Sequence, residues 1–334
     1  MIRCAHLITI SALVLTGACS SSGTGSTGTG GSGAGTGAGG SAGLSGSITV
    51  TFTSAIPADD AGNSGTAANA TISAAIYDSA FPPTLKSGAA SRVSESMSGC
   101  DLLVPSNATC DAGCPASPTL DGVGALHVHG LKASDGGTDI EIDPTGSMQN
   151  FYSGPTLLDP FPPCAEGSTV SVDAAGAGTI SAFSISGAKC IAPLVLTGPD
   201  PIPLVNAQKT PIGGALSWTP PAQGGNSKIQ VLLEVSHHSG TQYGQINCTV
   251  SDTGSFTIPQ KLIADLIALG TGGYPTITIS RVSTATSTAH PGVQLVITSG
   301  TDRSVDTGVV SCGANGDNTC PSGKTCQSPP YLCL

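Results

Sequence analysis

The sequence predicts an all-β protein with two tandem antiparallel β-sandwich domains, a disordered linker before them and a small disulfide-rich tail after them. Three observations lead to this prediction. Short runs alternate apolar and polar residues, as half-buried strands do. Glycine, with 46 of the 334 residues, and proline, with 24, supply turns between such strands. No long helical pattern is present, and the 39% of hydrophobic residues suffices to build cores.

The first domain is expected to cover residues 47–197. Its first run, "SITVTFTSAI", alternates Ile48, Val50 and Phe52 with threonines, which predicts a strand with one buried face. Turn residues separate almost all of the runs that follow, and this spacing is typical of an antiparallel sandwich. The further runs are "ATISAAIY", "GALHVHGL", "TDIEID", "STVSVDAAG", "TISAFSIS" and "APLVLTG".

The second domain is expected at residues 213–300, after a connection at 198–212 that has four prolines and little periodicity. It begins with "LSWTPP", in which Trp218 precedes a Pro-Pro turn. This start resembles fibronectin type III and related immunoglobulin-like modules, and the resemblance implies an immunoglobulin-like sandwich. The other strand-like runs are "KIQVLLEVS", "GQINCTVSD", "SFTIP", "PTITISRVS" and "GVQLVITS".

One helix is predicted inside the second domain. Pro259 suits its first turn and Gly270 suits its end. Because four apolar residues between them share one helical face, we expect the helix to close one end of the sandwich. These residues are Leu262, Ile263, Leu266 and Ile267.

The N-terminus has the pattern of an export signal over residues 1–18. A single positive charge at Arg3 precedes an apolar run that is too short to span a bilayer. The residues "LTGAC" that end at Cys19 resemble the lipobox of bacterial lipoproteins, although Thr16 stands where that family usually has leucine. The resemblance implies cleavage before Cys19, lipidation of its sulfur and, with Ser20 next to it, delivery to the outer membrane.

Residues 19–46 consist of the lipidated cysteine and a linker of glycine, serine and threonine, which has no apolar face to bury. A linker of this kind is expected to hold a folded body away from the lipid headgroups. The combination of lipobox, linker and paired sandwiches is similar to uncharacterised surface lipoproteins of myxobacterial type. The resemblance implies a protein of the bacterial cell envelope that is exposed at the surface.

Charge excludes one class of partner. The formal net charge is −10, the acidic residues are dispersed, and no basic run exists. Binding to nucleic acid needs clustered positive charge against the phosphates, so nucleic acid is not expected as a partner. The membrane, through the lipid anchor, and a protein or polysaccharide ligand are the expected partners.

The cysteines indicate an oxidising compartment. Without Cys4 of the leader and Cys19, an even number remains, as a disulfide framework requires. Residues 301–334 are polar and rich in cysteine, which predicts a small disulfide-bonded tail rather than a zinc knuckle, because no pair has the short spacing of such sites. The connectivity stays open among Cys100, Cys110, Cys114, Cys164, Cys190, Cys248, Cys312, Cys320, Cys326 and Cys333.

The stretch "LHVHG" contains the only motif with a pattern of metal ligands. His127 and His129 are two apart, so on a strand they point to the same face. The four residues "HVHG" resemble the copper-ligand strand of copper/zinc superoxide dismutase, but the rest of that ligand set is missing. Three alternatives remain: histidines satisfied by protein or solvent, an adventitious surface metal, and a functional metal site.

The turn "SDGG" is expected to decide between these alternatives. A two-residue loop puts Leu131 opposite Ile140 or Ile142, and the histidines then share that apolar face. A three-residue loop instead puts His129 opposite Asp143. Only the second register builds a metal-like pocket from the hairpin.

These observations predict a protein that is not an enzyme and uses no cofactor, with a structural or binding role at the cell surface. No serine lies in a strand-to-helix elbow, and Asp139, Glu141 and Asp143 are expected to form an outward stripe rather than a calcium site. Aromatic residues that could stack on sugars are few: Phe151, Tyr152 and Tyr243. The alternative is a secreted metal-dependent enzyme or metal-binding protein that uses the strand with His127 and His129.

Overall fold

The computed structural model describes most of the chain after the linker. The described residues are 43–56, 65–79, 91–105, 118–133, 135–145, 150–236, 243–272, 275–310, 312, 320–327 and 332–333. Residues 1–42, with the leader, Cys19 and most of the linker, lie outside these residues, as do Cys110, Cys114, His237 and His238. Contacts join Gly43–Leu334 into one compact unit, which is mostly β, as the sequence predicts.

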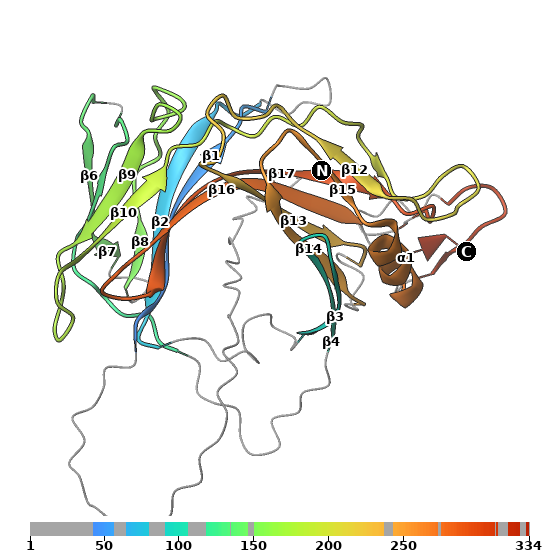
Figure 1. Cartoon of the computed structure of the whole chain (residues 1–334), viewed down its shortest axis with the longest axis horizontal. Coiled ribbons are helices and arrows are strands. Elements are labelled where there is room, and N and C mark those ends of the chain that lie inside the picture. Colours follow the sequence, from blue (N-terminus) through green and yellow to red (C-terminus); the bar gives the residue numbers. More distant parts are fainter. Residues whose placement is uncertain are drawn as a thin grey trace, which may run out of the picture. The chain divides into compact units, whose positions relative to one another are not determined.

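The largest sheet combines strands from both predicted domains (Figure 1). The long strands β16 and β17 lie at its centre, and β1 pairs with β17 in parallel, so the prediction of purely antiparallel strands is wrong here. The short β11 (Ile202–Pro203) also pairs with β17 in parallel. The order along the sheet is β3 (Ser91–Met97), β4 (Cys100–Pro105), β14 (Gln245–Ser251), β13 (Lys228–Glu234), β16 (Thr276–Thr286), β17 (Gly292–Asp306), β1 (Ser45–Thr53), β2 (Asn69–Tyr77), β8 (Phe151–Ser153) and β7 (Pro144–Thr145).

Three smaller sheets complete the fold. A four-stranded sheet has the order β10 (Phe183–Lys189), β9 (Thr169–Ala174), β5 (Leu126–His129) and β6 (Asp139–Ile142). A pair is formed by β12 (Gly214–Ser217) and β15 (Ser255–Ile258), and the tail contains β18 (Cys326–Gln327) and β19 (Leu332–Cys333). The predicted run "APLVLTG" is not a strand, because only Leu196 forms an isolated bridge, with Trp218.

Two hydrophobic cores lie against the large sheet, and β16 and β17 contribute to both. The first core fills the space between the four-stranded sheet and the strands β1, β2 and β17, where Leu295 and Ile297 are buried. The second core contains Ile277 and Ile279 of β16 together with residues of β12, β13, β14 and the helix. The two sandwich-like halves therefore share their central strands.

The helix forms as predicted. It is α1 (Gln260–Leu269), with Pro259 before its first residue and Gly270 after its last. Its buried residues Leu262, Ile263 and Leu266 join the second core. Within the described residues, no helix is long and apolar enough to cross a membrane.

The hairpin of β3 and β4 connects the two predicted domains. It belongs to residues 47–197, yet β4 pairs with β14 of the second predicted domain, and a disulfide joins Cys100 to Cys248 across this pair. The parallel pairing of β1 with β17 makes a second connection of the same kind. A count of two immunoglobulin-like domains is therefore not confirmed.

Candidate functional site

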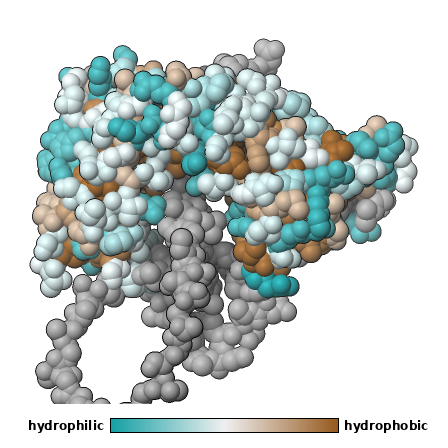
Figure 2. Space-filling view, in the orientation of Figure 1, coloured by the Kyte–Doolittle hydropathy of each residue, from teal (hydrophilic) through white to brown (hydrophobic). Residues whose placement is uncertain are grey.

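The outer face of the four-stranded sheet gathers histidines and carboxylates on adjacent strands. In β5, Leu126 and Val128 point into the first core, so the alternation of a strand turns His127 and His129 outward. The imidazoles are partly exposed, at 35% and 37%. On the view in Figure 2, hydrophilic residues gather along the edge where β6 lies.

The strands on both sides of β5 add acidic residues to this face. On β6, Glu141 lies opposite His127 and Asp139 lies opposite His129. On β9, Asp173 lies opposite His127. Ile140 and Ile142 point into the core, which confirms that Asp139 and Glu141 form an outward stripe. We call His127, His129, Asp139, Glu141 and Asp173 the histidine–carboxylate face.

Both registers expected for the hairpin are wrong. The pairing of His129 with Asp139 leaves residues 130–138 as the connection, which is far longer than two or three residues. The connection therefore extends on both sides of "SDGG", which was expected to be the whole turn. Instead, the backbone leaves β5 at Gly130, whose φ is +86°, and Ala133 closes a local turn with Gly136 and Gly137. The longer connection shifts the register and places the acidic residues beside the histidines.

Asp139 is the shared contact of the two histidines. Its Oδ1 atom lies 3.5 Å from Nδ1 of His127 and 3.5 Å from Nδ1 of His129. On the other side, Nε2 of His129 lies 3.0 Å from Oδ2 of Asp173. The two imidazole rings are nearly parallel, with centres 6.5 Å apart.

Asp173 is ionised at neutral pH. A hydrogen bond from the Ser184 hydroxyl on β10 is the main cause that lowers the pKa of Asp173 below its ordinary value. Burial, the second-largest influence, raises the pKa, and the contact with His129 lowers it. A full negative charge therefore faces Nε2 of His129.

The cysteines described form disulfides rather than a metal site. The pairs are Cys100–Cys248, Cys164–Cys190, Cys312–Cys326 and Cys320–Cys333. Within the described residues, one group of three metal-ligating types has its ligand atoms within 4.8 Å of one another, namely Cys312, Cys320 and Cys333. Disulfide sulfurs are not thiolates, so this group does not bind zinc. His127 and His129 do not form such a group in the present conformations, because their ring centres are 6.5 Å apart.

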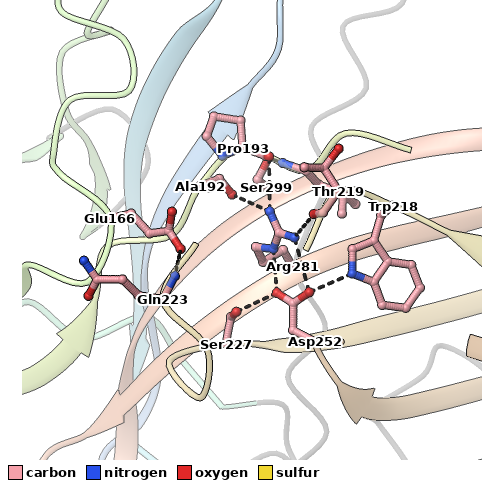
Figure 3. A network of polar contacts seen from close by, with 11 residues as sticks. Glu166, Ala192, Pro193, Trp218, Thr219, Gln223, Ser227, Asp252, Arg281 and Ser299 are labelled. Atoms are coloured by element: carbon pink, nitrogen blue, oxygen red, sulfur yellow. Dashed lines mark hydrogen bonds and ion pairs between the residues drawn. The ribbon is translucent and has the colours of Figure 1, made fainter. Parts of the chain in front are cut away.

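Sequence reasoning missed a buried polar network between the two cores (Figure 3). The Arg281 side chain on β16 contacts Asp252 through Nε at 2.6 Å, and both side chains are 1% exposed. Asp252 also accepts hydrogen bonds from the Trp218 indole at 2.7 Å and from the Ser227 hydroxyl at 2.6 Å. A signal existed in the sequence, because Arg281 is in phase with the buried Ile277 and Ile279 and therefore needs a buried partner.

The other candidate sites offer little room for a ligand. Tyr152 is buried on β8, where its hydroxyl contacts the backbone of Val123 and Gly124, so its ring is not available to stack on a sugar. Burial raises the pKa of Tyr152. An apolar cavity beside β12 measures about 10 Å³, which holds one water molecule at most. Its lining includes Leu196, Pro199, Ile202, Leu216 and Ile279.

No protein-family model, no curated protein and no solved structure matches this chain.

Proposed function

We propose that this chain is a lipid-anchored protein of the bacterial outer membrane, exposed at the surface, with a structural or binding role and no enzymatic activity. The residues "LTGAC" at the end of the leader, followed by a linker of glycine, serine and threonine, support the anchor at Cys19. The first described strand, β1, begins at Ser45 and takes in the last two residues assigned to this linker. A tethered β-rich body is therefore the arrangement that we propose.

The observation that carries the proposal is the set of disulfides. Four disulfides form among the described cysteines: one joins β4 to β14, one joins Cys164 to Cys190, and two lie within the tail. Such bonds persist outside the cytoplasm and are rare inside it. A leader for export and a body that is held by disulfides point to the same compartment.

The proposed binding role rests on surfaces rather than on an enclosed pocket. The cavity beside β12 is too small for a substrate. The burial of Tyr152 removes one of the few aromatic residues that could stack on a sugar ring, so a protein partner is supported better than a polysaccharide. Flat strand faces and strand edges are common surfaces for protein partners.

Replacement of Cys19 tests the anchor. The Cys19→Ser variant, expressed in a bacterium with lipoprotein processing, is expected to leave the membrane fraction, because the sulfur that carries the lipid is gone. Cell fractionation followed by detection of the protein measures the distribution. Cys4→Ser is the matched control: it also removes one cysteine near the N-terminus, but from the leader that is cut off, so its membrane attachment should not change. If Cys19→Ser stays in the membrane fraction, the proposed anchor is wrong.

A further inference from the structure

We propose that the histidine–carboxylate face binds a divalent transition-metal ion such as Zn²⁺. His127, His129 and Asp139 are the ligands, and Asp173 is a positioning residue that acts through His129. Anchoring at Cys19 requires no metal, so this inference goes beyond the proposed function and stands independently of it.

The first argument is the spacing around Asp139. Its Oδ1 atom is 3.5 Å from the Nδ1 atoms of both His127 and His129. Ligand atoms around a tetrahedral zinc ion, each about 2.0–2.1 Å from the metal, lie about 3.4 Å from one another. The two nitrogen–oxygen distances therefore already match two edges of a zinc coordination shell.

The second argument is the direction of the His129 lone pair. A carboxylate only accepts hydrogen bonds, so in the neutral imidazole that a metal requires, the contact of 3.0 Å with Asp173 places the single N–H on Nε2. Nδ1 is then a bare acceptor, and it faces a second carboxylate, Asp139. Two acceptors without a hydrogen between them repel each other, and a cation bound to both removes this repulsion. A histidine that donates to a carboxylate from its other nitrogen is also the usual arrangement of a metal-bound histidine.

The third argument concerns the freedom of the two rings. The ring centres are 6.5 Å apart, whereas two nitrogens bound to one zinc ion lie at most about 4.2 Å apart. The nitrogens of the two rings therefore have to come closer through side-chain rotation before both can bind one ion. The imidazoles are 35% and 37% exposed and the Asp139 side chain is 56% exposed, so solvent surrounds them and side-chain rotation is open to them. The backbone, which is held on both sides by β6 and β9, does not have to move.

The donor set selects the class of metal. Two imidazoles and a carboxylate suit zinc, copper or nickel, whereas calcium and magnesium prefer a shell of oxygens. Three protein ligands leave one tetrahedral position, and it faces solvent because the whole face is exposed. Glu141, next to Asp139 on the outward side of β6, adds negative charge that attracts a cation. The face is thus an open site that can take a further ligand from solution or from another molecule.

Zinc binding by the purified full chain tests the proposal. Isothermal titration with ZnCl₂ is expected to show one site per chain that the double variant H127A/H129A loses. Asp173→Asn is expected to weaken binding about 10-fold while keeping one site, because it removes only the hydrogen bond that orients His129. The matched control is H237A/H238A, which removes the same number of histidines elsewhere in the sequence and should bind zinc as the unmodified chain does.

A thermal unfolding series separates loss of the site from loss of the fold. Without zinc, H127A/H129A and Asp173→Asn should unfold at nearly the same temperature as the unmodified chain, because His127, His129 and Asp173 are partly exposed. Zinc should raise the unfolding temperature of the unmodified chain and of the control, but not that of H127A/H129A. Zinc binding of equal strength in H127A/H129A, or no binding by the unmodified chain, would overturn the proposal. Neither result would affect membrane attachment, which depends on Cys19 alone.

Discussion

Arg281 lies in the interior of the protein with an acceptor for each of its five N–H groups. Nε and one terminal nitrogen contact the two oxygens of Asp252, and the remaining N–H groups reach backbone carbonyls of Ala192, Pro193 and Thr219. Ala192 and Pro193 lie between Ile191 of the first core and Leu194 of the second, and Thr219 follows Trp218 of the second core. Arg281, buried and with all of its N–H groups bonded, therefore holds the segment between the two cores in place.

Substitution of Arg281 tests this role. Arg281→Met leaves the Asp252 carboxylate buried without its counter-charge, so we expect the free energy of unfolding to fall by about 3–5 kcal/mol in urea denaturation. Arg303→Met is the matched control, because its ion pair with Asp200 is partly exposed and its loss should cost less than about 1 kcal/mol. If both variants lost the same free energy of unfolding, burial would not make the pair of Arg281 and Asp252 more important for stability than an exposed pair.

The ion pair of Arg281 with Asp252 makes the stability of the fold depend on pH. Burial raises the pKa of Asp252, but hydrogen bonds from Arg281, Ser227 and Trp218 outweigh it, and the net pKa is below the ordinary value of 3.8. A carboxyl group whose pKa is lowered by folding stabilises the fold above its ordinary pKa. That stability is lost as the pH falls through the lower pKa of the folded state.

We therefore expect the unfolding temperature to decrease as the pH is lowered below about 4. Asp252→Asn cannot ionise at this position, so it should be less stable than the unmodified chain near neutral pH, and the difference should shrink in acid. Thermal unfolding of both proteins between about pH 2.5 and 6 measures this difference. A constant difference over that range would contradict the assignment to Asp252.

At the level of residues, the sequence pattern shows which side chains are buried but not which of them meet. Alternation in "PTITISRVS" places Arg281 in phase with Ile277 and Ile279. Its partner Asp252 follows β14, and the two meet only because β13 lies between β14 and β16 in the sheet. The contact between His129 and Asp173 has the same origin, since β5 and β9 are far apart in the sequence. Such contacts depend on strand order, which local patterns do not contain.

At the level of elements, the strongly patterned segments are predicted well and the weakly patterned ones are not. The helix is bounded by Pro259 and Gly270, as expected, because both residues act locally. The strand β3 was missed because "SRVSESM" is polar and lies at the edge of the sheet, where little of it is buried. The strand β17 continues to Asp306, well beyond the predicted run, since its polar second half is paired along its length with β16. Pairing, rather than hydrophobicity, determines these elements.

The division into two domains was also predicted from local patterns, and it has the same limit. A domain boundary was expected at 198–212 because prolines interrupt the pattern there. Interruption of the pattern marks a crossing from one layer to another, and here the chain crosses between two cores that rest on the same central strands. Strands β1 and β17 come from opposite ends of the body and pair with each other, so the largest sheet includes strands from both predicted domains.

For the whole molecule, the shared strands should make the two cores unfold together. A single cooperative transition is expected in differential scanning calorimetry, because β16 and β17 cannot leave one core and stay intact in the other. Independent sandwiches would instead give two transitions.

Substitutions in each core make this expectation specific. Ile72→Ala opens a cavity in the first core and Leu266→Ala opens one in the second, and each should cost about 2–5 kcal/mol. Both variants should move the whole transition to lower temperature, by roughly 2 °C per kcal/mol for a unit of this size. If Ile72→Ala split the transition and left part of it at the original temperature, the first core would be a separate cooperative unit. The shared strands would then act as a covalent connection between two domains and not as one structural unit.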